Sequence, residues 1–144
     1  MKRFLFLALF LLIATPVTAE MLSVIHQPAE LRSQPQVARA KILADLPRYA
    51  PLEVLETAAE YYKVKNSRGQ VGYIHRSLVG KQDSLVITAD VCNIRSAPGT
   101  EHPIAFKAVQ GNSFRALSKQ GEWLEIVDAQ GNTGWVWQKL TWGY

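Results

Sequence analysis

Short apolar and aromatic runs alternate with clusters of turn residues along most of this 144-residue chain. In the C-terminal half, turn residues such as Gly, Asn and Pro separate the runs Val86–Thr88, Phe114–Leu117, Trp123–Val127 and Gly134–Trp137. Runs of this length and spacing predict short strands and a small all-β fold. Closing the strands into a barrel would remove the sheet edges that promote aggregation. Residues 36–46 and 102–109 are less regular, and we expect both to be loops with one turn at most.

The alternation of side chains along a strand predicts which residues face the core. In the run 123–127, Leu124 and Ile126 share one face, and Trp123 lies on the other. In the similar run 61–65, Lys63 and Lys65 share the face of Tyr61, which indicates that this face is in water. By the same rule the inward side chains include Val136 and Ile74, and the outward ones include Trp135, Trp137, Tyr73 and His75.

The two halves of the chain repeat the same pattern. Residues 31–35 match residues 94–98 at an offset of 63 positions. The blocks 61–64 and 69–74 match 123–126 and 131–136 at an offset of 62. Blocks in the same order at a nearly constant offset indicate a duplicated module. We expect module 1 at residues 23–79, a linker at 80–84 and module 2 at 85–140.

The first residues have the pattern of an export signal. Lys2 and Arg3 precede an apolar run of 11 residues at 4–14, and Val17 and Ala19 occupy the −3 and −1 positions. A membrane-spanning helix takes about 20 residues, so we expect a signal peptide at 1–19, cleaved after Ala19, rather than a membrane anchor. The remaining 125 residues hold 14 basic and 12 acidic side chains, a net charge of +2 instead of +4. This small excess does not indicate a nucleic-acid-binding surface.

Module 2 resembles the bacterial SH3 domain over its whole length. The shared features are Asn93-x-Arg95-x-x-Pro98-Gly99-Thr100, Gly111, Trp123-x-x-Ile126 and Gly131-x-x-Gly134-Trp135-Val136, ending at Leu140. Module 1 is a degenerate copy, in which Glu30, Gln36, Tyr61 and Tyr73 replace the Asn, the Gly and the two Trp. The resemblance implies an all-β fold of two tandem small SH3-like β-barrels. It also implies binding of extended ligands, often cell-wall peptides, in an exported bacterial protein.

The outward aromatic side chains are candidates for a ligand-binding groove. They are Trp123, Trp135 and Trp137 in module 2 and Tyr61 and Tyr73 in module 1. Such rings can stack on an extended peptide. Alternatively, they close the barrel ends or pack module against module, because an indole is too large to be fully buried in so small a core. For Trp137, and for Trp142 and Tyr144 near the C-terminus, packing between the modules or a clasp at the terminus is favoured.

Arg95 and Arg32 each precede a proline turn. Either guanidinium could bind a ligand carboxylate in a bidentate manner. The interpretation that we favour is structural, with each guanidinium holding its turn through hydrogen bonds to loop carbonyls. Asn93 is interpreted as a cap of the same turn.

Cys92 and His102 are the only pair typical of nucleophilic catalysis. Cys92 shares the core-facing side of its strand with Ile94, and a thiol buried in apolar surroundings is inert. His26 and His75 lie in other blocks without metal-ligand spacing, so we expect no metal and no cofactor. Because the two modules occupy nearly all residues after the signal, we also expect no catalytic domain and no enzymatic activity.

The sequence therefore predicts an exported protein, periplasmic or extracellular, that binds an extended peptide. The expected partner is a cell-wall (peptidoglycan) peptide or a segment of an envelope protein, with no nucleic acid and no stable membrane insertion after signal cleavage. The alternative is a structural partner of another envelope protein. In that case Trp123 and Trp135 would be buried between the modules, and no groove would be open.

Overall fold

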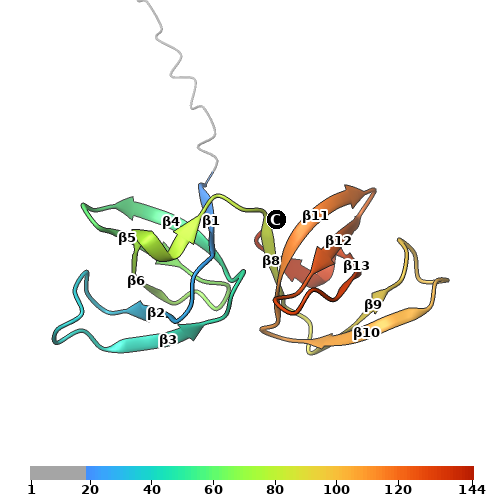
Figure 1. Cartoon of the computed structure of the whole chain (residues 1–144), viewed down its shortest axis with the longest axis horizontal. Coiled ribbons are helices and arrows are strands. Elements are labelled where there is room, and N and C mark those ends of the chain that lie inside the picture. The colour runs from blue at the N-terminus through green and yellow to red at the C-terminus, as the bar shows by residue number, and fades with distance from the viewer. Residues whose placement is uncertain (1–18) are drawn as a thin grey trace, which may run out of the picture.

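The computed structural model describes residues 19–144, so the predicted signal peptide lies almost wholly outside the described residues. In Figure 1 the chain forms two groups of strands that lie side by side. Module 1 contains β1 (Met21–Val24), β2 (Ala29–Arg32), β3 (Ile42–Leu46), β4 (Pro51–Thr57), β5 (Tyr61–Lys65), β6 (Val71–His75), the 3-10 helix η1 (Arg76–Leu78) and β7 (Val79–Gly80). Among residues 19–144 there is no helix long and apolar enough to cross a bilayer.

Module 2 repeats this order of elements. It contains β8 (Ser84–Ile87), β9 (Val91–Arg95), β10 (Ile104–Val109), β11 (Ser113–Gln120), β12 (Trp123–Val127), β13 (Thr133–Trp137), the 3-10 helix η2 (Gln138–Leu140) and β14 (Thr141–Trp142). The strands extend slightly beyond the module limits expected from the sequence, since β1 begins at Met21 and β14 ends at Trp142. Gly80 and Ser84 belong to strands, which leaves residues 81–83 as the connection.

Each module is one seven-stranded antiparallel sheet, so the predicted all-β class with two SH3-like modules is confirmed. The strand orders are β3-β2-β6-β5-β4-β1-β7 and β10-β9-β13-β12-β11-β8-β14, which are equivalent. In module 1, every strand contributes to a single buried cluster, so the sheet encloses its own core. The outermost strands β3 and β7 are not paired with each other, and closure into a full barrel is not detected.

The alternation of apolar side chains places the core as predicted. Leu124, Ile126 and Val136 are fully buried in module 2, as are Val64 and Ile74 in module 1. Their neighbours along β5, β6, β12 and β13 are mostly half-buried and lie on the outer face. Period-two burial of this kind is what one covered face and one wet face produce.

The expectation of loops at residues 36–46 and 102–109 is wrong, because both segments contain strands. β3 pairs with β2, and β10 pairs with β9, each at the edge of its sheet. Most of their side chains are exposed, and the pairing is interrupted by irregularities at Leu31/Arg32 and at Ile104/Phe106. A bulge breaks the alternation of side chains, so these strands leave no period-two pattern in the sequence.

The modules meet where β8 lies against β4 and β1. All four residues of β8 are buried, including Ser84 and Val86. The Ser23 hydroxyl is fully buried, bonds to the Ser84 hydroxyl and donates to the carbonyl of Gln82 in the connection. Near the C-terminus, Gly143 lies directly against Pro51 of module 1. Burial on both faces of one strand requires a second covering layer, which here is the other module.

Candidate functional site

The outer face of module 2 is hollowed into a groove of about 430 Å³. We call this cavity groove 2. Trp123 and Trp137 lie directly opposite each other across the β12–β13 pairing, so their indoles share one wall. The lining side chains also include Asn93 and Arg95 from β9, Gly99, Thr100 and Glu101 from the following loop, and Leu140 from η2.

Module 1 has a groove of similar size, about 420 Å³, at the equivalent place. We call it groove 1. Tyr61 and His75 are directly opposite each other across β5–β6, and their rings meet edge to face with centroids 5.1 Å apart. The remaining lining residues are Pro28, Glu30, Arg32, Val37, Ser77 and Leu78. Most residues that line groove 1 are therefore at positions of the repeat that line groove 2 in module 2, but most of their side chains differ.

The two arginines lie in different electrostatic surroundings. In groove 1, Arg32 Nη2 is 2.5 Å from Glu30 Oε2, and the two side chains are only 20% and 28% exposed. In groove 2 the position of Glu30 is taken by Asn93, and Arg95 Nη1 donates to the backbone carbonyl of His102 at 3.2 Å. The structure thus supports the expected bond from Arg95 to a loop carbonyl. Within residues 19–144, no carboxylate forms an ion pair with Arg95.

Trp137 makes two side-chain contacts that restrain its indole. Its indole Nε1–H donates to Glu122 Oε2 at 3.3 Å. The Lys139 ammonium lies over the ring, 5.4 Å from the centroid. A cation at this distance is attracted by the ring face. Trp137 as a whole residue is 37% exposed and lines the groove.

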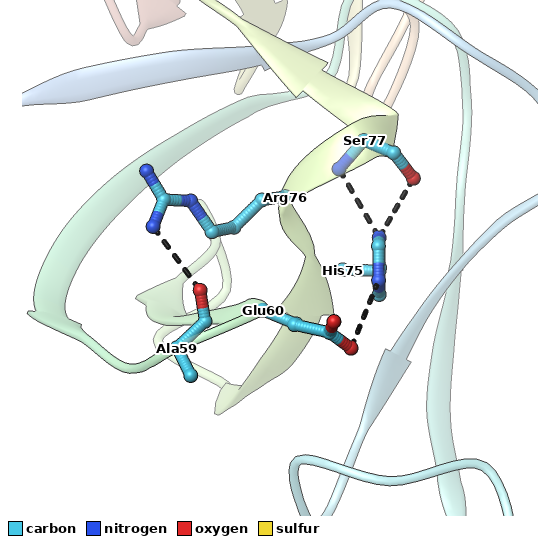
Figure 2. Close-up of polar contacts among 5 residues, drawn as sticks. All are labelled: Ala59, Glu60, His75, Arg76 and Ser77. Atoms are coloured by element: carbon cyan, nitrogen blue, oxygen red, sulfur yellow. Dashed lines mark hydrogen bonds and ion pairs between the residues drawn. The ribbon is translucent and has the colours of Figure 1, made fainter.

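His75 caps the 3-10 helix at the rim of groove 1 (Figure 2). Its Nδ1 accepts the backbone N–H of Ser77 at 3.2 Å and lies 2.7 Å from the Ser77 hydroxyl. Its Nε2 faces Glu60 Oε2 at 3.9 Å, while the neighbouring Arg76 Nη1 donates to the Ala59 carbonyl at 3.1 Å. Ser, His and Glu together are residue types of a hydrolase triad; here His75 and Ser77 form the N-cap of η1, and Glu60 lies beside the imidazole.

The structure separates the predicted site residues into three groups. Trp123, Trp137 and Arg95 line groove 2, and Tyr61 and Arg32 line groove 1. Trp135 pairs with Arg95, and Tyr73 with Arg32, on neighbouring strands. Neither aromatic residue lines a groove. The position of Trp137 differs from the packing role that the sequence favoured for it. Trp142 lies on β14 beside β8, and Tyr144 is 48% exposed under the Lys119 ammonium.

The alternative with Trp123 and Trp135 buried between the modules differs from what the structure shows. Groove 2, which contains Trp123, is lined only by residues of module 2. Trp135 is half-buried on β13, paired with Glu125 of the same module. Trp123 therefore lines a groove of module 2 rather than a space between the modules.

Sequence reasoning assigned other roles to several lining residues. Asn93, interpreted as a turn cap, makes no side-chain hydrogen bond within residues 19–144 and lines groove 2 instead. In the sequence, Glu30 is only a departure from the family pattern and Leu140 only the end of that pattern, yet both line a groove, as does Leu78. The signal that could have found them is the repeat itself, because equivalent positions of the repeat line the groove in both modules.

Cys92 lies in the core, as predicted, and is 5% exposed. Burial raises the pKa of its thiol, while a backbone hydrogen bond with Ala108 opposes this shift. His102 is instead on the surface, with Nε2 3.5 Å from Glu101 Oε1. Among residues 19–144, His, Cys, Asp and Glu form no cluster of three that could hold a metal ion.

Comparison with known proteins connects this fold to a family of small modules. The family model of the bacterial SH3 domain matches residues 28–80 and 89–141. These two segments cover most of the chain, one in each module.

Individual relatives match over single segments. A Bacillus subtilis (strain 168) protein described as the putative N-acetylmuramoyl-L-alanine amidase YrvJ is 33% identical over 60 residues, which are 42% of this chain and 12% of that protein. The probable cell wall amidase LytH of Staphylococcus aureus is 32% identical over 57 residues, which are 38% of this chain and 20% of that protein. The matched regions are thus small parts of both relatives.

Among solved structures, NlpC2 from Trichomonas vaginalis aligns with 89% of this chain and 49% of its own. The TM-score is 0.38 and the sequence identity 10%.

Proposed function

Because this chain belongs to the bacterial SH3 domain family, with two tandem copies, we propose that it is an exported, non-enzymatic protein that binds peptides of the bacterial cell wall. Groove 2 is the main binding site. The ligand is an extended peptide from peptidoglycan, which lies across the two indoles and meets the polar side chains of β9.

The observation that carries the proposal is the open aromatic wall of groove 2. Trp123 and Trp137 are held side by side by strand register, and Trp137 is fixed further by Glu122 and Lys139. Aromatic rings that are already ordered bind a ligand with little loss of side-chain entropy. Pocket volumes of about 300–1,000 Å³ suit small ligands or short peptide segments, and groove 2 lies within this range at about 430 Å³.

The relatives support the choice of ligand. Two of them are named as amidases of the cell wall or of N-acetylmuramoyl-L-alanine, and their similarity to this chain covers a single segment of each. A module shared by such enzymes is well suited to hold a protein on the wall. The absence of catalytic function is proposed from Cys92, whose thiol is buried away from His102.

Co-sedimentation of the purified chain with isolated sacculi tests the proposal. We expect the wild type to sediment with the sacculi, and Trp123→Ala and Trp137→Ala to weaken the interaction about tenfold or more, because a buried aromatic contact is worth about 2 kcal/mol at a binding hot spot. Tyr144→Ala is the matched control, since it removes an exposed aromatic ring outside both grooves. A wild type that stays in the supernatant, or losses equal to that of Tyr144→Ala, would contradict the proposal.

A further inference from the structure

We propose that groove 2 binds the free C-terminal carboxylate of a peptide through Arg95, whereas groove 1 does not read a carboxylate because Glu30 already neutralises Arg32. The inference rests on the proposed function, since it names the chemical group that the same site selects. It makes the two modules different in ligand preference and not only in affinity.

The difference originates at one position of the repeat. Glu30 and Arg32 are two residues apart on β2 and therefore share its outer face. Asn93 and Arg95 have the same relation on β9. In groove 1 the carboxylate of Glu30 forms an ion pair with Arg32. In groove 2 the uncharged amide of Asn93 takes the place of that carboxylate, so Arg95 has no acidic partner there among residues 19–144.

Arg95 has unused hydrogen-bonding capacity at the groove. A guanidinium carries five N–H donors, and one side-chain bond of Arg95, to the His102 carbonyl, is present. The side chain is half-buried and lines groove 2. Planar, paired donors of this kind match the two oxygens of a carboxylate, and such charge-assisted bonds are stronger than neutral ones.

The acidic side chains near groove 2 have other partners. Glu101 lines the groove and faces His102 Nε2 at 3.5 Å, with its side chain 73% exposed. Glu122 accepts the indole N–H of Trp137. Neither carboxylate is paired with Arg95. An incoming carboxylate therefore does not need to displace an internal one in groove 2, as it would in groove 1.

The rest of groove 2 fits the chain that precedes such a carboxylate. The indoles of Trp123 and Trp137 offer apolar surface for small side chains, and the amide of Asn93 can donate to and accept from a peptide backbone. Leu140 adds further apolar surface to the lining. The site combines one cation, one neutral amide and an aromatic wall with the carboxylate of Glu101, whose side chain is 73% exposed. The cation, the amide and the aromatic wall suit a peptide end, and the exposed Glu101 carboxylate is screened by water.

A pair of peptides that differ only in charge tests the inference. The probes are N-acetyl-Ala-Ala with a free carboxylate and the same peptide with a C-terminal carboxamide, titrated into the full chain while the indole N–H signals of Trp123 and Trp137 are followed by NMR. We expect the acid to bind about tenfold more tightly than the amide, because a hydrogen bond to a charged group contributes about 1.5–3 kcal/mol.

Substitutions at the divergent repeat position provide the controls. Asn93→Glu copies groove 1 and should abolish the preference for the acid. Asn93→Gln introduces a side chain of the same shape as Glu but without the charge, and it should keep the preference. Arg95→Gln should also abolish it, and its thermal unfolding is measured beside it because Arg95 supports the His102 loop. Glu30→Gln should give module 1 a new preference for the acid, reported by shifts of Tyr61.

The outcomes separate this inference from the proposed function. Equal affinity for acid and amide, failure of both to bind, or equal effects of Asn93→Glu and Asn93→Gln would overturn the carboxylate inference. If the chain nevertheless sediments with sacculi through Trp123, the cell-wall function stands without it. A chain that prefers the acid but ignores sacculi would support the carboxylate site and contradict the cell-wall ligand.

Discussion

Module 1 and module 2 have the same strand order and equivalent core positions, but the side chains of their grooves differ. At the paired aromatic positions, Tyr61 and His75 in one module correspond to Trp123 and Trp137 in the other. A core residue is constrained by close packing on every side, whereas a residue on the outer face is packed on one side only. The two modules therefore share a conserved core and strand order, and they differ on their outer faces.

Both modules should lose stability when the glycine that precedes the outer aromatic residue of β6 or β13, Gly72 or Gly134, is replaced by a larger residue. A Cβ at Gly72 would lie 2.7 Å from the Arg32 carbonyl oxygen and 2.8 Å from Leu31 Cγ, and a Cβ at Gly134 would lie 2.4 Å from Ile94 Cγ2. We expect Gly72→Ala and Gly134→Ala to lower the free energy of unfolding by about 1–3 kcal/mol each, as overpacking does. Urea unfolding measures the loss.

The effect should be larger for Gly72→Ala, because a backbone oxygen cannot rotate away as a side chain can. Gly80→Ala is the control, since its nearest neighbour is the end of the Ile25 side chain at 3.0 Å, and a change of about 0.5 kcal/mol or less is expected there. If both core glycines tolerate Ala as well as Gly80 does, the close approach between strands is not what keeps the two modules alike.

The sequence was sufficient for the features that depend on local pattern. Alternation identified the core residues Leu124, Ile126 and Val136, and the repeat offset identified two modules. It failed for β3 and β10, where exposed side chains and bulges remove the alternation. Edge strands are defined by backbone hydrogen bonds to one neighbour, and those bonds impose no requirement on side-chain type.

The groove was only partly predictable for a related reason. The alternation along the strands correctly placed Trp123, Trp135 and Trp137 on the outer face. It does not say which of the outer residues line a common groove. Trp137 lines groove 2, whereas Trp135 does not, because the groove is completed by the loop around Gly99 and by η2. The pairing of Arg32 with Glu30 was also beyond the sequence argument, since it depends on side-chain conformation.

In the core, Cys92 of module 2 occupies the repeat position of Ala29 in module 1. Because only the thiol can ionise, this difference should make the stability of module 2 depend on pH. Both side chains are buried. Burial raises the pKa of the thiol in the folded state, so at high pH the unfolded chain ionises first. The stabilising contribution is complete below the ordinary thiol pKa of about 8.5 and is lost as pH rises toward the folded pKa.

Cys92→Ala converts this position to that of module 1 and should remove this pH dependence. At pH 7 we expect the variant to lose about 1 kcal/mol, roughly the value of the buried atom, and the deficit relative to wild type should shrink by pH 10. Urea unfolding of both proteins at the two pH values measures it, and the other titrating groups cancel in the difference. An unchanged deficit would show that the thiol does not ionise preferentially on unfolding.

The smallest expected difference concerns the turn between the last two long strands of each module. Asp128 accepts the backbone N–H groups of Gln130 and Asn132 at 2.9 and 2.8 Å, and Asn66 accepts those of Arg68 and Gln70 at 3.1 and 3.0 Å. Burial tends to raise the pKa of Asp128, but the hydrogen bonds of the turn outweigh it, and the pKa is lowered overall.

A lowered folded pKa means that Asp128 stabilises the protein above the ordinary carboxyl pKa of about 3.9 and that this contribution is lost as pH falls through the folded value. Asp128→Asn should therefore flatten the acid limb of the stability curve, and Asn66→Asp should steepen it by giving module 1 the same turn. Thermal unfolding between pH 2 and pH 6 compares the three proteins. Parallel curves would show that the carboxylate and the amide serve this turn equally, so that the modules differ here in sequence alone.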